Sequence, residues 1–189
     1  TTSFQANFEQ EQFTKVYNRR QRSSGRVVFK KPGRMRFDYA APNGQVFVSD
    51  GQRLVVYQPP ETGETEGQLI ERAMDSDQLP QAFSFLTGTG RLDRDFNFRL
   101  LNARQHEFPD GYVLALRPRR PNANYEQLLF FVRVVGEGEQ RAGVRQRVLI
   151  RGAQGDTNRF TFVGMQFNRD VPDDRFVFRA PPNTRTVQN

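Results

Sequence analysis

The sequence predicts a mainly β protein, in which an antiparallel sheet of about ten strands curls around an apolar hollow. Three observations favour this fold class. Short runs of alternating apolar and polar residues recur along the chain, turn residues separate them, and a single segment has helical spacing. Hydrophobic residues make up only 36% of the 189 residues, yet 18 residues are Phe. Few but large apolar side chains suit thin β walls better than a helical bundle.

The first half of the chain has the clearest strand signals. Residues 34–39 alternate strictly, which places two sets of side chains on opposite faces: Met35, Phe37 and Tyr39 on one, Arg34, Arg36 and Asp38 on the other. Turns are expected at Pro42–Gly44 and at Asp50–Gly51. Strands are therefore expected at residues 8–17, 25–30, 34–39, 46–48 and 54–57.

A change of period marks the middle of the chain. Asp75 to Leu86 has apolar residues at helical spacing, with Pro80 in the first turn and Gly88 and Gly90 after the end. Strands are then expected at residues 96–101, 111–116, 127–135, 145–151, 159–166 and 176–178. No linker, repeat or low-complexity tract interrupts the chain, so residues 1–189 are expected to form a single domain.

The charge points first to an anionic partner. The net charge is +7 and the pI is about 10.3, values that suit nucleic acid or an anionic membrane surface. However, the 21 acidic residues are interspersed with the basic ones, which favours a largely solvated exterior. Residues 34–39 also separate charged from aromatic side chains, whereas nucleic-acid binding needs them interleaved. Nucleic-acid binding therefore stays a weaker alternative.

Little in the sequence indicates catalysis. The chain has no cysteine and a single histidine, His106, which excludes thiolate sites and disfavours a histidine-based metal site or catalytic triad. We therefore expect no catalytic residue, no metal and no cofactor. No apolar run approaches the roughly 20 residues of a membrane span, and no signal peptide is visible after Thr1.

Several motifs follow one another in a recognisable order. Residues 31–59 contain Lys31-Pro32-Gly33, the aromatic pair Phe37 and Tyr39, Pro42, Val48-Ser49-Asp50-Gly51, Leu54 and Tyr57-Gln58-Pro59. Outside this stretch stand FQANFEQ at residues 4–10, Gly25, the helical segment, and an ending that runs from Phe176 to Pro182 and on to Val187. In these motifs and their order the chain resembles the LolA family, the periplasmic carriers of outer-membrane lipoproteins in Gram-negative bacteria.

The resemblance implies a fold and a function. The fold would be an incompletely closed antiparallel β-barrel of about ten or eleven strands, with a short helical lid over a hydrophobic cavity. The protein would be a non-enzymatic periplasmic chaperone without cofactors, which ferries lipoproteins from the inner to the outer membrane. Its partners would be lipoprotein acyl chains, an inner-membrane lipoprotein-releasing ABC transporter and an outer-membrane receptor. Nucleic acid is not expected, and membranes only in transient proximity.

The resemblance also implies roles for individual residues. The acyl-chain cavity would be lined by Met35, Phe37, Tyr39, Val46, Val48, Leu54 and Val56. The apolar underside of the lid would be formed by Leu79, Phe83 and Leu86. Lys31 stands before Pro32, where the family has a basic residue, commonly arginine, that bonds lid carbonyls. A lysine at this position is expected to act as a less directional latch, because it lacks the planar fork of arginine.

Two features of the family are missing or altered, and two rival functions remain. The family has a helix before its first strand, but here that strand follows Thr1 almost directly, so the helix is trimmed, disordered or absent. The outer-membrane receptor of the same pathway shares the fold, but it has a lipidated N-terminal cysteine and an apolar projecting loop. The lack of cysteine and the short Ala41–Gly44 turn favour the carrier. The other rival is a basic β-barrel that binds nucleic acid.

Overall fold

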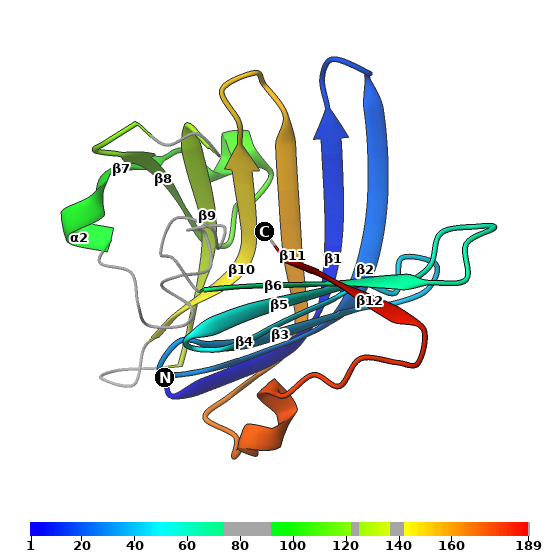
Figure 1. The fold of residues 1–189 in the computed structure, drawn as a ribbon. Helices are drawn as coiled ribbons and strands as arrows, with labels where there is room; N and C mark the ends of the chain where they lie inside the picture. The colour runs from blue at the N-terminus through cyan, green and yellow to red at the C-terminus, as the bar shows by residue number, and fades with distance from the viewer. Residues whose placement is uncertain (74–91, 122–124, 137–141, 189) are drawn as a thin grey trace. The chain divides into compact units, whose positions relative to one another are not determined.

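The structure is a computed structural model, and it describes residues 1–73, 92–121, 125–136 and 142–188. Almost all regular structure in these residues is β-strand (Figure 1). The strands are β1 (Ser3–Thr14), β2 (Arg19–Lys30), β3 (Arg34–Tyr39), β4 (Val46–Asp50), β5 (Arg53–Gln58), β6 (Gly67–Ala73), β7 (Phe96–Leu101), β8 (Tyr112–Pro118), β9 (Gln127–Val135), β10 (Ala142–Arg151), β11 (Thr157–Phe167) and β12 (Thr184–Gln188). The short helices are α2 (Leu92–Asp95), η1 (Ala103–His106) and η3 (Asp173–Phe176).

The strands of the described residues form one sheet in the order β12-β6-β5-β4-β3-β2-β1-β11-β10-β9-β8-β7. The ladders from β2 to β6 and from β7 to β11 are antiparallel, whereas β12 pairs with β6 in parallel. Because the order begins and ends with different strands, the sheet is not closed. The predicted fold class, a mainly β and mostly antiparallel sheet without full closure, is confirmed.

The strand prediction failed at residues 15–17, near the C-terminus and around residue 70. Residues 15–17 were expected in the strand over 8–17, but β1 ends at Thr14 and the chain turns there. Residues 176–178 do not form a strand, because the chain makes the 3₁₀ turn η3 and buries Phe176 against the sheet. The sequence also did not indicate β6 or β12. Both are short and carry charged side chains, so neither shows a long apolar alternation.

The chain divides into two compact units. Unit 1 comprises Thr1–Phe8, Ser23–Gly90 and Gly164–Asn189, and unit 2 comprises Glu9–Arg22 and Arg91–Val163. Strands β1, β2 and β11 contribute residues to both units.

In unit 1 the η3 segment packs on one face of the sheet. Val28 and Val48 are buried there against Val171 and Phe176, with Val46 and Phe178 at the margin. In unit 2 the core lies under η1, where Phe108 packs on Val113, Ala115, Leu129 and Phe131. Phe108 and Phe131 meet edge to face, with ring centroids 5.5 Å apart. None of the helices in the described residues is long and apolar enough to span a membrane.

Candidate functional site

One face of the unit 1 sheet is covered with aromatic rings. Phe8 contacts Phe37 at 5.4 Å and Tyr39 at 4.9 Å between ring centroids, and Phe29 contacts Phe37 at 5.6 Å. Phe4 and Phe47 extend the series at its two ends through Phe29 and Tyr39. We call these six residues, together with Met35, Leu54, Val56 and Ile70 on the same side, the aromatic face.

The strand register decides which predicted cavity residues belong to this face. Phe37 pairs with Phe47, Phe47 with Val56, and Val56 with Ile70, so their side chains point the same way. Met35, Tyr39 and Leu54 share that side by alternation. Most of them are buried, with Tyr39, Phe47 and Ile70 only half-buried. Five of the seven predicted residues therefore line one face: Met35, Phe37, Tyr39, Leu54 and Val56.

The prediction that Val46 and Val48 point to the same face was wrong. Val48 pairs with Arg36 and Val46 with Asp38, so both valines lie on the opposite side. There they pack with Val28 and the η3 segment. The cause is the continuous apolar run Val46-Phe47-Val48, whose alternation is not visible in the sequence. Phe47, which the sequence did not single out, takes the place on the aromatic face.

The opposite side of the same strands is held by ion pairs. Arg36 donates to both carboxylate oxygens of Asp38 at 2.8–2.9 Å and to the Arg175 carbonyl at 3.1 Å. Lys30 and Arg34 donate to Asp173 at 2.6 and 2.7 Å. The Lys30 hydrogen bond and the Arg34 charge lower the pKa of Asp173 below its ordinary value. As the alternation of residues 34–39 predicts, the arginines point away from the aromatic rings.

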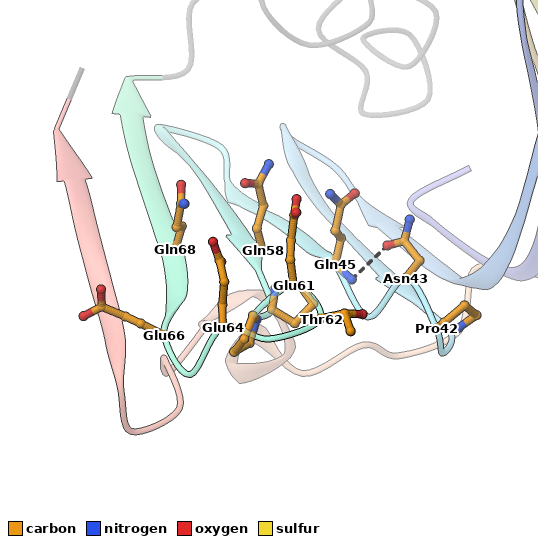
Figure 2. A pocket seen from close by; sticks show the side chains of 11 residues that line it. Pro42, Asn43, Gln45, Gln58, Glu61, Thr62, Glu64, Glu66 and Gln68 are labelled. Carbon is orange, nitrogen blue, oxygen red and sulfur yellow. Dashed lines mark hydrogen bonds between the residues drawn. The ribbon is translucent and has the colours of Figure 1, made fainter.

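A row of glutamines ends the aromatic face at one edge. Gln45, Gln58 and Gln68 stand on neighbouring strands, each two residues from Phe47, Val56 or Ile70 and on the same side. Figure 2 shows the three side chains pointing the same way from β5, β6 and the start of β4. The Gln45 backbone N–H donates to Asn43 Oδ1 at 3.0 Å, which fixes the turn before β4.

A polar groove lies beside this glutamine row. Its volume is about 600 Å³. The rim is built from the two turns that flank β4 and β5, and it is lined by Pro42, Asn43, Gln45, Gln58, Pro59, Pro60, Glu61, Thr62, Glu64, Glu66 and Gln68 (Figure 2). At this edge, the aromatic face therefore borders a groove lined by amides and carboxylates.

Unit 2 has an apolar surface of its own. Phe98, Leu100 and Tyr112 share one side of β7 and β8, opposite the core under η1. Their exposed fractions are 63%, 59% and 48%. We call these three residues the β7–β8 apolar edge. Isolated exposed apolar residues are ordinary, but three together on the last two strands of the sheet order form a patch that an apolar ligand can cover.

The predicted lid and latch can be placed only in part. Leu79, Phe83 and Leu86 lie outside the described residues. Lys31 is exposed, and its backbone N–H donates to the Thr2 carbonyl at 2.9 Å. Its predicted contact with the lid stays a prediction. Among the described residues, no three histidine or carboxylate side chains lie close enough together to hold a metal ion.

Comparison with known proteins decides the family. The family model described as "Outer membrane lipoprotein carrier protein LolA" matches residues 1–179. The chain belongs to the LolA family. Two carriers, both named "Outer-membrane lipoprotein carrier protein", illustrate the similarity. The one from Cupriavidus taiwanensis is 31% identical, covering 84% of this chain and 67% of the relative. The one from Alkalilimnicola ehrlichii is 31% identical, covering 99% and 78%.

Solved structures agree on the fold. A LolA superfamily protein from Nitrosomonas europaea matches with a TM-score of 0.50 at 16% identity, covering 94% of this chain and 90% of the other. An uncharacterized conserved protein from Thermus thermophilus matches with a TM-score of 0.54 at 12% identity, covering 100% and 91%. The chain is thus a LolA-family outer-membrane lipoprotein carrier protein, a member of a non-enzymatic transport family.

Proposed function

We propose that this LolA-family chain works in the periplasm and carries lipoproteins by holding their acyl chains against the aromatic face of unit 1. The observation that carries this proposal is the segregation of the two sides of β3–β5. One side presents contacting aromatic rings, and the other is occupied by ion pairs and the η3 segment. The ring side is therefore the one suited to an acyl chain.

The affinity of such a face has to be limited. Each buried methylene is worth about 0.8 kcal/mol, so full burial of one chain of about sixteen carbons would exceed roughly 10 kcal/mol. Release would then be too slow for a carrier. The aromatic face is mostly buried in the structure, so cargo has to separate rings that now pack against one another. This competition lowers the net affinity to a reversible range.

The glutamine row suits the polar end of the cargo. A lipoprotein presents ester and amide groups where its acyl chains meet the peptide. Amide side chains both donate and accept hydrogen bonds, so Gln45, Gln58 and Gln68 match that chemistry. Tyr39, Phe47 and Ile70, the half-buried members of the aromatic face, lie near this edge. We place the entrance for the acyl chains there.

The carrier role implies two proteins that exchange cargo with this chain. An inner-membrane lipoprotein-releasing transporter would load the chain, and an outer-membrane receptor would accept the cargo. A lid with Leu79, Phe83 and Leu86 on its underside would cover the bound chains, with Lys31 as its latch. In this proposal Lys31→Leu speeds cargo hand-off to receptor-bearing membranes and Lys31→Arg slows it. Equal rates of hand-off by the two variants and the wild type would refute the latch role of Lys31.

Neighbouring residues of β4 offer a matched test of the acyl-chain face. The chain has no cysteine, so a single cysteine can be labelled cleanly with a fluorophore. Phe47→Cys places the label on the aromatic face, and Val46→Cys places it on the opposite side at similar burial. A fatty acid brominated along its chain quenches a fluorophore only when the two are in contact. Quenching of the label at 47 and not at 46 is expected.

The same pair can also refute the proposal. Equal quenching at the two positions would mean that the acyl chain does not distinguish the two sides of the sheet. Quenching at 46 alone would place the lipid under η3. Unlabelled lipoprotein should compete with the brominated fatty acid and restore the signal at 47, which ties the fatty-acid site to the natural cargo.

A further inference from the structure

The turn between β1 and β2 has an unusual sequence for its position. Lys15-Val16-Tyr17-Asn18 joins two strands of 12 residues each. The Asn18 N–H closes the turn on the Lys15 carbonyl at 3.1 Å, and Asn18 has φ 47°. The two central residues, where polar or glycine residues are usual, are Val16 and Tyr17. They are 71% and 79% exposed, so packing within the protein does not account for them.

This turn is held in place by the neighbouring hairpin of unit 2. The Lys15 backbone N–H donates to Asp156 Oδ1 at 2.7 Å, and the Lys15 side chain lies over Gly155, where a Cβ would meet Lys15 Cδ at 2.8 Å. Gly155 belongs to the β10–β11 turn, which ends beside the β1–β2 turn in Figure 1. Val16 and Tyr17 are therefore presented on an anchored turn instead of a loose one.

Cations surround the two exposed side chains. Residues 12–22 contain Lys15, Arg19, Arg20 and Arg22 and no acidic residue. Arg20 and Arg22 reach back to Glu11 at 3.3 and 3.1 Å while remaining 64% and 81% exposed.

The carboxylate of Glu11 forms ion pairs with several arginines near this turn. Arg159 also contacts Glu11, at 3.1 Å. Burial alone would raise the pKa of Glu11, but Arg159, Arg22 and Arg20 together lower it, so the carboxylate stays charged. With Asp156 included, five cations face two carboxylates around the turn, a surplus of positive charge.

We propose that the β1–β2 turn docks on an anionic lipid membrane, with Val16 and Tyr17 in the interface and Arg19, Arg20 and Arg22 on the phosphates. Tyrosine suits the membrane interface because its apolar ring can enter the lipid while its hydroxyl remains hydrated. Basic residues near an anionic surface each add a modest attraction, so binding is weak and reversible. This inference goes beyond the carrier role and does not depend on where the acyl chains bind. It also gives a role to part of the +7 charge.

Insertion can be observed directly because the chain has no tryptophan. Tyr17→Trp makes a single reporter, whose emission should shift to the blue when the protein meets vesicles of phosphatidylcholine with about a third phosphatidylglycerol. Val177→Trp is the matched control, since Val177 is 57% exposed but lies in unit 1 beside η3. The expected result is a blue shift at 17, none at 177, and a much smaller shift with phosphatidylcholine alone.

Two double variants separate the apolar from the electrostatic contribution. Val16→Ser with Tyr17→Ser should weaken sedimentation with the anionic vesicles by at least about tenfold. Arg19→Gln with Arg20→Gln should weaken it by roughly 25-fold, since each of the two cations contributes about fivefold. Arg22 and Arg159 still pair Glu11 in that variant. Arg179→Gln with Arg185→Gln removes the same charge from exposed positions in unit 1 and should change binding little.

Three results would overturn the proposal. The first is no blue shift at position 17 with anionic vesicles. The second is an equal loss of binding in the two arginine pairs, which would mean attraction by net charge alone. The third is binding to duplex DNA at least as strong as to the vesicles and unaffected by the Val16 and Tyr17 substitutions, which would assign the turn to nucleic acid.

Discussion

The aromatic face of unit 1 and the β7–β8 apolar edge of unit 2 are built on the same alternation but differ in exposure. Phe29 and Phe37 are 1% and 5% exposed. Phe98 and Leu100 are 63% and 59% exposed. The residue types are alike, so composition does not explain the difference. Position in the sheet does: β3 pairs with β2 and β4, whereas among the described strands β7 pairs with β8 alone and ends the sheet order.

The two surfaces differ in what their side chains contribute: the aromatic face stabilises the fold, whereas the β7–β8 apolar edge is accessible to a ligand. A ring that touches several others contributes to the free energy of unfolding, whereas an exposed ring contributes little until a ligand covers it. Substitutions on the aromatic face should therefore disturb folding and cargo binding together. Substitutions at the β7–β8 apolar edge should leave folding almost unchanged, and any effect on cargo there would report contact with the cargo itself.

The largest expected effect is that of Phe29→Ala. Phe29 is 1% exposed and contacts Phe4 and Phe37, so its truncation should lower the free energy of unfolding by about 3–5 kcal/mol. Phe98→Ala is the matched control at 63% exposure and should cost less than about 1 kcal/mol. Urea denaturation followed by circular dichroism measures both. Equal losses would contradict the contrast between the two surfaces.

A smaller effect is expected on the η3 side of the unit 1 sheet. Val48 is 2% exposed and packs with Val28 and Phe176. Val48→Ala should therefore lower the free energy of unfolding by roughly 1–3 kcal/mol. Because Val48 points away from the aromatic face, quenching of a label at residue 47 by brominated fatty acid should persist under conditions where the variant is folded. Loss of quenching would mean that the two sides of the sheet are not independent.

The sequence predicted faces within a strand better than the register between strands. Residues 34–39 alternate apolar and charged side chains, so one strand alone shows which side is which. Val46-Phe47-Val48 shows no such contrast, and the choice depends on pairing with residues far away in the sequence. For that reason the prediction for Val46 and Val48 was wrong and Phe47 was missed.

Gly25 shows a further limit of reading one strand at a time. The sequence predicts that a strand begins at Gly25, but the requirement for glycine at this position comes from tertiary contacts. A Cβ at Gly25 would collide with the Asp38 carbonyl oxygen and would meet the Phe8 ring at 2.8 Å. The missing side chain lets Phe8 lie over β2 and reach Tyr39. The groove beside the glutamine row was missed for a similar reason, since its polar residues come from separate turns.

The smallest effect concerns the ion pair that ties η3 to the sheet. The Lys30 hydrogen bond, aided by Arg34, lowers the pKa of Asp173 below its ordinary 3.8. The native state therefore favours the ionised carboxylate, which adds stability above pH 3.8 that is lost as the pH falls through the lower native value. Because the Asp173 side chain is 62% exposed, the gain is small and screened by salt.

Asp173→Asn should consequently lower the melting temperature slightly at neutral pH and low salt, and the difference from the wild type should shrink at acid pH. Asp174→Asn removes the same charge one residue further on, outside this ion pair, and serves as the control. Thermal unfolding at neutral pH and well below pH 3.8 measures both variants. A deficit that grows toward acid pH would contradict the lowered pKa of Asp173. A deficit shared equally by the two variants would mean that net charge, and not the contact of Asp173 with Lys30 and Arg34, holds η3 on the side opposite the aromatic face.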